Sequence, residues 1–196
     1  MNKLTQAEIR RAVNGGGRTE LRREECRDAA VLVPLLEIGD EWHLLFTKRT
    51  EDLEHHRGQV SFPGGSLDEN ESYEAAALRE TFEEIGIPAQ VVEIVGFLHD
   101  IWTPSRFVIT PVVGIVQSLD RLEINPGEVS RVFTVPVSFF CNDDNAEIRN
   151  ITLYGLERQV HFYKYDGETI WGATAIILRD LVKRLSMPAS RRNGNT

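Results

Sequence analysis

The stretch GGSLDENESYEAAALRETFEEIG, residues 64–86, carries more information about fold and function than any other part of the chain. It predicts a glycine-containing loop followed by a helix. It holds seven acidic residues and one basic residue, a net charge of −6 out of −8 for the whole chain. Like charges one helical turn apart destabilise a helix by about 0.2–0.5 kcal/mol per pair. This crowding of acids therefore indicates a bound divalent cation.

The helix expected from Ser72 to Ile85 places its C-terminal glutamates on one side. Glu80, Glu83 and Glu84 are spaced i, i+3 and i+4, so their side chains are neighbours. Three carboxylates directed at one point suit Mg²⁺ or Mn²⁺, because both prefer oxygen ligands. The opposite side is expected to pack on the core through Ala75, Leu78, Phe82 and Ile85. The alternative is a solvated acidic face without a ligand.

The spacing of this stretch resembles the Nudix box, a long and specific motif. The matching positions are Gly65, Glu71, Arg79, Glu80, Glu83, Glu84 and Gly86. One position departs, since Thr81 stands where the motif has an aliphatic residue, and its angle places it near the edge of the helix. The resemblance implies an α+β fold, a Nudix-type α/β/α sandwich with a mixed β-sheet and a catalytic loop-helix motif.

The resemblance also implies roles for individual residues. Implied metal ligands are the carboxylates of Glu80, Glu83 and Glu84 and the backbone carbonyl of Gly64. Glu71 and Arg79 are implied to brace the loop against the helix. The chemistry of arginine agrees, because its planar, permanently charged side chain can hold a carboxylate through two hydrogen bonds. A simple surface ion pair is the alternative for Arg79.

The segment before the box narrows the range of candidate substrates. The sequence HRGQVSFPGG, residues 56–65, together with Leu53, resembles the signature that coenzyme A diphosphatases carry just upstream of the Nudix box. That signature normally has an arginine directly after the position of Leu53, whereas this chain has Glu54. Arg57 is a nearby candidate to take over a phosphate contact. The departure leaves the recognition of a 3′-phosphate open.

Several cations in the same segment fit a polyanion site, because a metal and neighbouring cations can share a diphosphate between them. The candidate substrate-binding residues are Lys48, Arg49, Arg57, Gly64 and Gly65. His55 and His56 are not expected to bind the metal, since imidazole suits softer metals than a carboxylate site does.

A further acid lies in the second half of the chain. Glu128 precedes a β-rich run over residues 131–135. Several Nudix enzymes place an additional catalytic or metal-binding glutamate in a comparable loop, so Glu128 is a candidate for that role, with an ordinary loop acid as the alternative. Together with Arg79, Glu80, Glu83 and Glu84, it completes the candidate catalytic set.

The length of 196 residues predicts one domain. We expect an N-terminal helix and linker over residues 1–27, a Nudix domain over residues 28–186, and a polar tail over residues 187–196. Two cysteines, the absence of an apolar leader and the absence of an apolar run of about 20 residues predict a cytoplasmic protein without a membrane span.

The net charge of −8 and the sequence pI of about 5.2 argue against binding to long nucleic acids or anionic membranes. A small anionic substrate stays compatible with this charge, because a bound metal reverses the local sign. The expected partner is therefore a small molecule, coenzyme A or a related nucleotide diphosphate. The oligomeric state is left open, with a homodimer as one option.

Three functional hypotheses follow. The first is metal-dependent hydrolysis of the diphosphate bond of coenzyme A and its derivatives, to 3′,5′-ADP and 4′-phosphopantetheine. The second is the same reaction on ADP-ribose, a dinucleoside polyphosphate or a nucleotide sugar, and Glu54 keeps it open. The third is a Nudix-like binding module without turnover, which the complete set of motif glutamates disfavours. The general base is either a glutamate of the helix or Glu128.

Overall fold

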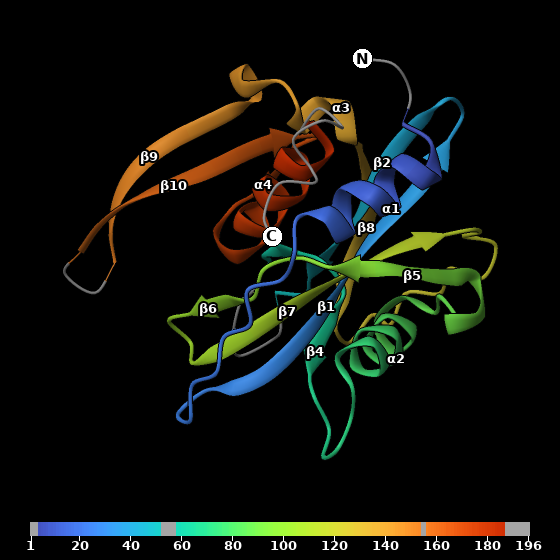
Figure 1. The fold of residues 1–196 in the computed structure, drawn as a ribbon, viewed down its shortest axis with the longest axis horizontal. Helices are drawn as coiled ribbons and strands as arrows, with labels where there is room; N and C mark the ends of the chain where they lie inside the picture. Colours follow the sequence, from blue (N-terminus) through green and yellow to red (C-terminus); the bar gives the residue numbers. More distant parts are fainter. Residues whose placement is uncertain (1–3, 52–57, 154–155, 187–196) are drawn as a thin grey trace.

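The computed structural model describes residues 4–51, 58–153 and 156–186 (Figure 1). Its helical elements are α1 (Gln6–Gly15), α2 (Tyr73–Ile85), η1 (Ala89–Val91), α3 (Val137–Phe140), η2 (Asp143–Asn145) and α4 (Gly172–Ser186). Its strands are β1 (Arg27–Ile38), β2 (Glu41–Arg49), β3 (Val60–Ser61), β4 (Gly64–Ser66), β5 (Val92–Phe97), β6 (Ile101–Thr103), β7 (Phe107–Val116), β8 (Val129–Pro136), β9 (Ala146–Leu153), β10 (Leu156–Tyr165) and β11 (Glu168–Ile170). Within these ranges, none of the helices combines the length and the apolar character that a membrane crossing requires.

The main sheet is mixed, as expected. Its path runs β3-β2-β1-β7-β5, while β4 pairs with β1, β6 with β7 and β8 with β2. The pairing of β1 with β7 is parallel, and the other pairings are antiparallel. The long parallel pairing places β1 in the centre of the sheet, next to both the glycine-containing loop before α2 and α2 itself.

Helices cover both faces of this sheet, which gives the predicted α/β/α sandwich (Figure 1). On one face, Val33 and Leu35 of β1 pack in a cluster with Ile9 of α1 and Leu178 of α4. The other face of β1 packs in a second cluster with α2, through residues such as Ala76. Because both faces are buried, the inner strands are almost continuously apolar.

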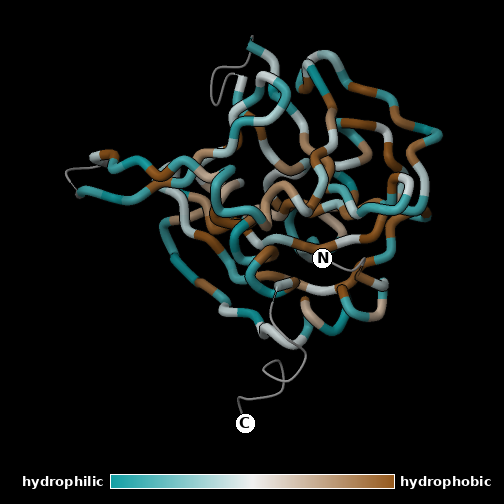
Figure 2. The backbone as a smooth tube through the Cα atoms, turned by 90° about the horizontal axis from the view of Figure 1, so that it is seen from above, coloured by the Kyte–Doolittle hydropathy of each residue, from teal (hydrophilic) through white to brown (hydrophobic). Residues whose placement is uncertain are grey.

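A separate antiparallel sheet, in the order β11-β10-β9, follows the main sheet in the chain. The β9–β10 hairpin projects away from the body of the molecule in both ribbon and tube views (Figures 1 and 2). At its base, the ring of Phe162 stacks on Trp171, with centroids 5.7 Å apart. These late strands therefore form a sheet of their own.

The ends of α2 agree with the sequence prediction. The Ser72 hydroxyl accepts a hydrogen bond from the Ala75 amide at 3.2 Å, which satisfies one of the free N–H groups at the start of the helix. Gly86 ends the helix in the left-handed region, with φ +72°, where glycine carries no steric penalty.

The buried side of α2 differs from the prediction. Ala75 and Phe82 were expected to pack on the core, but both are exposed, and Phe82 keeps 56% of its surface. The helix instead buries Ala76, Ala77, Thr81, Glu84 and Ile85. Small side chains on this side let the helix approach the sheet closely. The expected position of Thr81 near the edge is also wrong, since Thr81 is fully buried and its hydroxyl donates to the Ala77 carbonyl at 2.6 Å.

Candidate active site

Arg79 organises the outer part of the site, here called the outer corner and formed by Glu71, Arg79, Glu80 and Glu83. Its Nε and Nη2 donate to the two carboxylate oxygens of Glu71, each at 2.9 Å. Nη1 donates to Glu80 at 2.9 Å and to Glu83 at 3.1 Å. Nη2 also donates to the carbonyl of Ser66 at 3.1 Å, which ties the loop to the helix. The predicted brace between Glu71 and Arg79 is present in the structure.

The electrostatics of the outer corner follow from these bonds. Hydrogen bonds from Arg79 hold the pKa of Glu71 below its ordinary value. The same carboxylates raise the pKa of Arg79, with Glu71 as the largest contributor. For Glu80, burial raises the pKa while the bond from Arg79 opposes the shift. The outer corner is therefore a hydrogen-bonded network in which one arginine is shared by three carboxylates.

A second group of residues lies on the sheet side of α2, and we call it the inner corner: Arg49, Thr50, Glu84 and Glu128. The Glu84 side chain is only 3% exposed, and its nearest cation is Arg49, whose Nη1 is 3.7 Å from Glu84 Oε1. Burial raises the pKa of Glu84 to about 8, and the negative charges of Glu128 and Glu80 act in the same direction. Arg49 opposes this shift but does not cancel it.

The inner corner concentrates polar atoms that lack partners. In the part of the chain that the structure describes, four buried side-chain polar atoms have no hydrogen-bond partner, and His43 Nδ1 is one of them. The other three are Arg49 Nε, Thr50 Oγ1 and Glu84 Oε2, all within the inner corner. Buried polar groups are usually hydrogen-bonded, and each orphan costs about 1–3 kcal/mol. Orphans of both signs at one place indicate a ligand site.

The loop over residues 117–128 connects the inner corner to the end of α2. Amides of the loop donate to the last carbonyls of the helix, Glu123 to Ile85 at 3.0 Å and Asn125 to Glu84 at 2.9 Å. At the end of the loop, the carbonyl of Glu128 accepts from the amide of Thr50 at 3.0 Å. These bonds bring Glu128 next to Glu80 and Glu84, so that its charge acts on both carboxyl groups.

The two glycines before the helix allow a close approach on each side. A Cβ at Gly64, where φ is +151°, would lie 2.3 Å from the carbonyl oxygen of Ala30 in β1. A Cβ at Gly65 would lie 2.4 Å from the carboxyl carbon of Glu80. Glycine is thus required at Gly64, where the backbone lies in the left-handed region and a side chain would meet the backbone of β1, while a side chain at Gly65 would displace the Glu80 carboxylate.

Of the cations predicted to bind substrate, one lies in the inner corner and another is engaged in a separate ion pair. Arg49 belongs to the inner corner. Lys48 is engaged elsewhere, since its ammonium forms an ion pair with Glu168 at 3.0 Å, and Arg131 contacts the same carboxylate. The predictions for Arg57, together with the departure at Glu54, fall outside the described residues.

The acidic and arginine-rich surroundings fit a divalent cation. The donor set consists of carboxylate oxygens, which suits Mg²⁺ or Mn²⁺, and Glu84 Oε2 is a buried acceptor without a donor. Among the described residues, however, the carboxylates do not form a ready-made cage for a metal ion. Arg79 holds Glu80 and Glu83 in the outer corner. Cation binding would therefore require these two side chains to exchange Arg79 for the metal.

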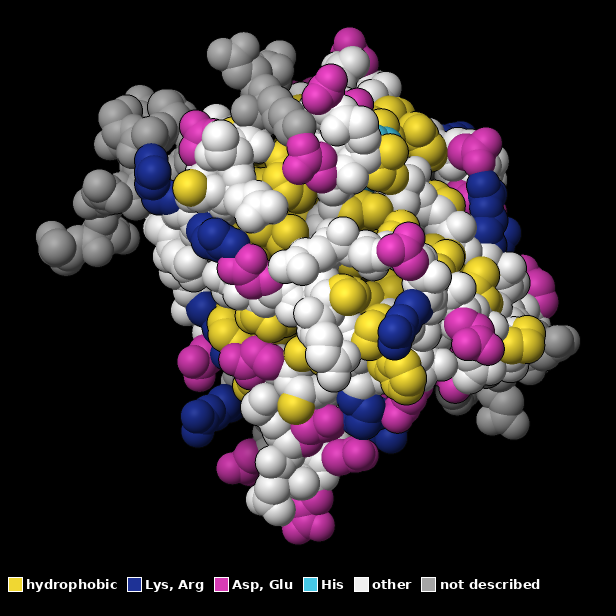
Figure 3. Space-filling model, turned by 90° about the vertical axis from the view of Figure 1, so that its right-hand side faces the viewer, with side chains coloured by type: hydrophobic (Ala, Val, Ile, Leu, Met, Phe, Trp, Pro, Cys, Tyr) yellow, Lys and Arg dark blue, Asp and Glu magenta, His cyan; other side chains and the backbone are white. Residues whose placement is uncertain are grey.

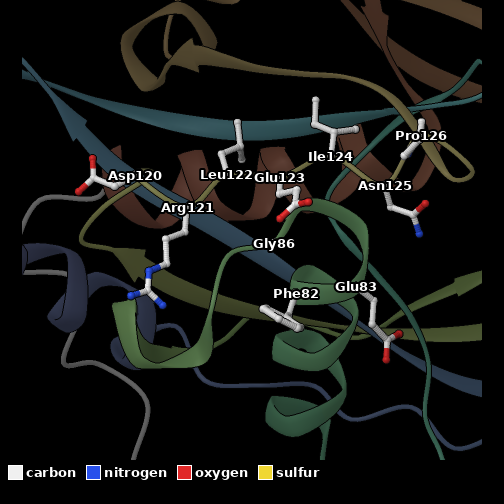
Figure 4. Close-up of a pocket in the computed structure, with 10 residues that line it drawn as sticks. All are labelled: Phe82, Glu83, Gly86, Asp120, Arg121, Leu122, Glu123, Ile124, Asn125 and Pro126. Carbon is white, nitrogen blue, oxygen red and sulfur yellow. The ribbon is translucent and has the colours of Figure 1, made fainter.

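A shallow groove runs along the C-terminal end of α2, beside the carboxylates (Figure 4). Phe82, Glu83 and Gly86 line it on the helix side, and residues 120–126 line it on the loop side. The space-filling view shows further acidic side chains at the lower end of the molecule, where Figure 1 has the loop before α2 (Figure 3). The groove itself is lined by three acidic residues, Glu83, Asp120 and Glu123, and by Arg121.

Sequence reasoning missed two residues of the site. Thr50 follows the predicted cation Arg49 directly, and its hydroxyl is one of the buried orphans. Asn125 hydrogen-bonds to Glu128 and to the backbone of α2. The sequence Asn125-Pro126-Gly127 is a strong turn signal, and attention to it would have identified a tight turn directly before the candidate glutamate.

The comparisons with known proteins agree with this site. Residues 27–154 match the model of the NUDIX domain, which is more than half of the chain. The chain belongs to the Nudix family. As a Nudix hydrolase it belongs to a class that acts on diphosphate bonds and generally uses divalent cations. The match ends at residue 154, so α4 and most of the separate β-sheet lie beyond it.

Relatives of this Nudix hydrolase cover most of its length. A protein of Enterobacter sp. (strain 638) is 39% identical over 162 residues, which is 82% of this chain and 84% of its own. A protein of Photorhabdus laumondii is 36% identical over 162 residues, which is 82% of this chain and 86% of its own. Both carry the name uncharacterized Nudix hydrolase NudL.

Solved structures support the Nudix fold. The MutT protein from Methanosarcina mazei superposes with a TM-score of 0.53 at 16% identity, over 89% of this chain and all of that one. A MutT/nudix family protein from Enterococcus faecalis gives a TM-score of 0.50 at 17% identity, over 90% of this chain and 73% of that one. At these identities the likeness concerns the fold alone.

Proposed function

We propose that this Nudix hydrolase cleaves the diphosphate bond of coenzyme A and its derivatives, with Mg²⁺ or Mn²⁺ as the cofactor, to give 3′,5′-ADP and 4′-phosphopantetheine. The reaction class follows from family membership. The choice of coenzyme A rests on the segment HRGQVSFPGG, residues 56–65, and its resemblance to the signature of coenzyme A diphosphatases.

The observation that carries the proposal is the set of orphaned polar atoms at the inner corner. Arg49 Nε is a buried donor suited to an oxyanion, and Glu84 Oε2 is a buried acceptor suited to a cation. A diphosphate bound together with a divalent cation provides both partners at once. Neither an apolar ligand nor an anion alone would satisfy both atoms.

Residues of the chain would share the work as follows. Glu80, Glu83 and Glu84 would hold the cation, together with the backbone carbonyl of Gly64. When bound, the cation supplies Lewis-acid polarisation of phosphoryl oxygens and lowers the pKa of water. Arg49 would hold the diphosphate through its free donor, which positions the phosphorus and offsets the charge that develops on its oxygens.

Glu128 is the proposed general base. Glu80, Glu83 and Glu84 each contact an arginine, whereas among the described residues Glu128 forms no ion pair with a cation. In the proposed reaction, a water oxygen attacks one phosphorus, the bridging P–O bond breaks, and Glu128 accepts the proton of the water. The leaving phosphate departs as an anion, so atoms and charges balance.

The test is a product assay on coenzyme A, resolved by mass, with Mg²⁺, with Mn²⁺ and with EDTA. The proposal predicts metal-dependent release of 3′,5′-ADP and 4′-phosphopantetheine. Release of other fragments would contradict the assigned bond. Absence of turnover across a panel of diphosphates would instead favour a binding module without catalysis.

One observation favours a second candidate function. Glu54 stands where the coenzyme A signature has an arginine, so the 3′-phosphate lacks an expected cation at this position. The alternative is therefore hydrolysis of another nucleoside diphosphate derivative, such as ADP-ribose, a dinucleoside polyphosphate or a nucleotide sugar. Equal kcat/KM values for coenzyme A and dephospho-coenzyme A would favour this alternative.

A further inference from the structure

We infer that Asn125 is a positioning residue for Glu128, and that it couples the orientation of this carboxylate to the C-terminal end of α2. This inference rests on the proposed function, because it assigns a role in turnover to Glu128. Asn125 itself lies in the loop before Glu128 and is not proposed to touch the reacting atoms.

The side chain of Asn125 makes two hydrogen bonds that fix the orientation of its amide. Its Oδ1 accepts from the Gly127 amide at 3.1 Å. Since a backbone N–H can only donate, this bond turns the Nδ2 group in the other direction, toward Glu128. Nδ2 donates to Glu128 Oε1 at 3.2 Å. One carboxylate oxygen of Glu128 is thereby held, and among the described residues no hydrogen bond engages the other.

The backbone of Asn125 connects the same turn to α2. Its amide donates to the carbonyl of Glu84 at 2.9 Å, and its carbonyl accepts from Glu128 at 3.1 Å and from Val129 at 2.9 Å. Figure 4 shows its side chain pointing from the loop toward the side of α2 that carries Glu83. Asn125 is therefore bonded both to the residue that bears the innermost helix carboxylate and to the loop carboxylate opposite.

This arrangement has a functional consequence. A general base must be aligned with the water that it deprotonates, and a displacement of about 1 Å can lower a rate by about a hundredfold. Glutamate has three rotatable side-chain bonds, and the hydrogen bond donated by Asn125 Nδ2 removes much of that freedom. Asn125 would therefore raise kcat by restricting Glu128, with little effect on substrate affinity.

A double-mutant cycle tests the inference. Asn125→Asp keeps an acceptor for Gly127 but removes the donor to Glu128 and places a like charge beside it. Asn125→Ser keeps a hydroxyl that can accept from Gly127 without adding a charge. Both are measured in the native chain and in a Glu128→Ala background, with coenzyme A as substrate and Mg²⁺ at saturation. Asn145→Asp is the matched control, because Asn145 bonds to the Phe139 carbonyl in another turn.

In the native chain, we expect Asn125→Asp to lower kcat at least about tenfold with KM within about twofold, and Asn125→Ser to lower kcat less. In the Glu128→Ala background, neither substitution should lower kcat further, since residues that act through one group are not additive. Asn145→Asp should leave both constants unchanged. An equal fold-change in both backgrounds, or no change in the native chain, would overturn the inference.

Crystal structures of Asn125→Asp and Asn125→Ser provide a readout that does not need turnover. We expect the Glu128 carboxylate to move while the backbone of residues 123–128 stays in place. An unmoved carboxylate would overturn the inference. If the native chain cleaves no diphosphate at all, the proposed function fails, and the crystal structures still decide the positioning role separately.

Discussion

Both corners of the site contain an arginine and glutamates, but the two corners differ in how far these side chains are hydrogen-bonded. In the outer corner, Arg79 makes hydrogen bonds to Glu71, Glu80 and Glu83, all between 2.9 and 3.1 Å. In the inner corner, Arg49 and Glu84 are 3.7 Å apart, and each keeps a buried polar atom without a partner. In this structure Arg79 is hydrogen-bonded to all three carboxylates of the outer corner, whereas the inner corner keeps buried donors and acceptors that a ligand could satisfy.

This difference separates structural charges from functional ones. Arginine–carboxylate pairs with bidentate geometry stabilise a fold when every donor and acceptor is used. Buried charges without full hydrogen bonding cost stability, and they persist where function requires them. We therefore expect substitutions of Glu71 and Arg79 to act mainly on stability, and substitutions in the inner corner to act mainly on turnover. Glu80 and Glu83 lie between the two cases, because Arg79 holds them in this structure and they are also proposed to hold the cation.

The largest expected effect is on turnover, in the inner corner. Glu84→Gln should lower kcat by at least about a hundredfold, the scale of losing one preorganised electrostatic stabiliser. The free energy of unfolding of the metal-free protein should not fall, because glutamine replaces a buried carboxyl group whose ionised form the site disfavours. Steady-state kinetics and urea unfolding measure the two quantities. Glu69→Gln, an exposed acid of the loop before α2, is the control. A kcat for Glu84→Gln close to that of Glu69→Gln would remove the distinction between the corners.

The second effect is a pH dependence of stability that arises from Glu84. Burial raises its pKa to about 8 in the folded state, against an ordinary value of 4.5. Between these values the folded state binds more protons than the unfolded state, so the free energy of unfolding falls as pH rises. In EDTA we expect a loss of a few kcal/mol from about pH 5 to pH 8. Glu84→Gln should flatten this slope in urea titrations, and an unchanged slope would exclude Glu84 as its source.

The third effect is on stability, in the outer corner. Arg79→Ala leaves Glu71, Glu80 and Glu83 without their shared donor, so we expect the free energy of unfolding to fall by about 2 kcal/mol. Arg79→Lys should recover part of this loss, because lysine keeps the charge but not the fork of donors. Chemical denaturation measures both variants. Native stability in Arg79→Ala would show that the network does not brace the loop.

The smallest expected effect is a difference in kcat/KM between substitutions of two adjacent cations, Arg49 and Lys48. Arg49→Ala should lower kcat/KM at least about tenfold, since it removes a charged donor from the diphosphate site. Lys48→Ala should change kcat/KM less than about twofold, because the Lys48 ammonium is held by Glu168, which keeps its contact with Arg131. Parallel kinetics on the two variants make the comparison. A larger loss in Lys48→Ala than in Arg49→Ala would place the substrate on the other face of β2.

The sequence predicted the catalytic helix well but not the side that it buries. Ser72 and Gly86 are strong local signals, and they cap the two ends of α2. The apolar stripe was misassigned because the rule that apolar residues face inward fails where a carboxylate must reach a buried site. Here Glu84 is inside and Phe82 is outside. Such conflicts between pattern and structure are expected at functional sites.

Contacts between segments that are far apart in the sequence were the other feature that the sequence did not predict. A strand pattern in the sequence does not say which sheet the strand joins, and β9, β10 and β11 form a sheet of their own. The same holds for the inner corner, where Arg49, Glu84 and Glu128 come from three distant segments. Their proximity depends on the pairing of β2 with β8 and on the bonds from the 117–128 loop to α2, which no local signal encodes.

The most direct test of the inner corner is an anomalous difference map from crystals soaked in Mn²⁺. The account predicts a peak bonded to the Glu84 carboxylate, with Glu80 and Glu83 turned from Arg79 toward the ion. A map without a peak beside Glu84, in crystals where Mn²⁺ is visible elsewhere, would contradict the claim that this buried carboxylate exists to hold a divalent cation.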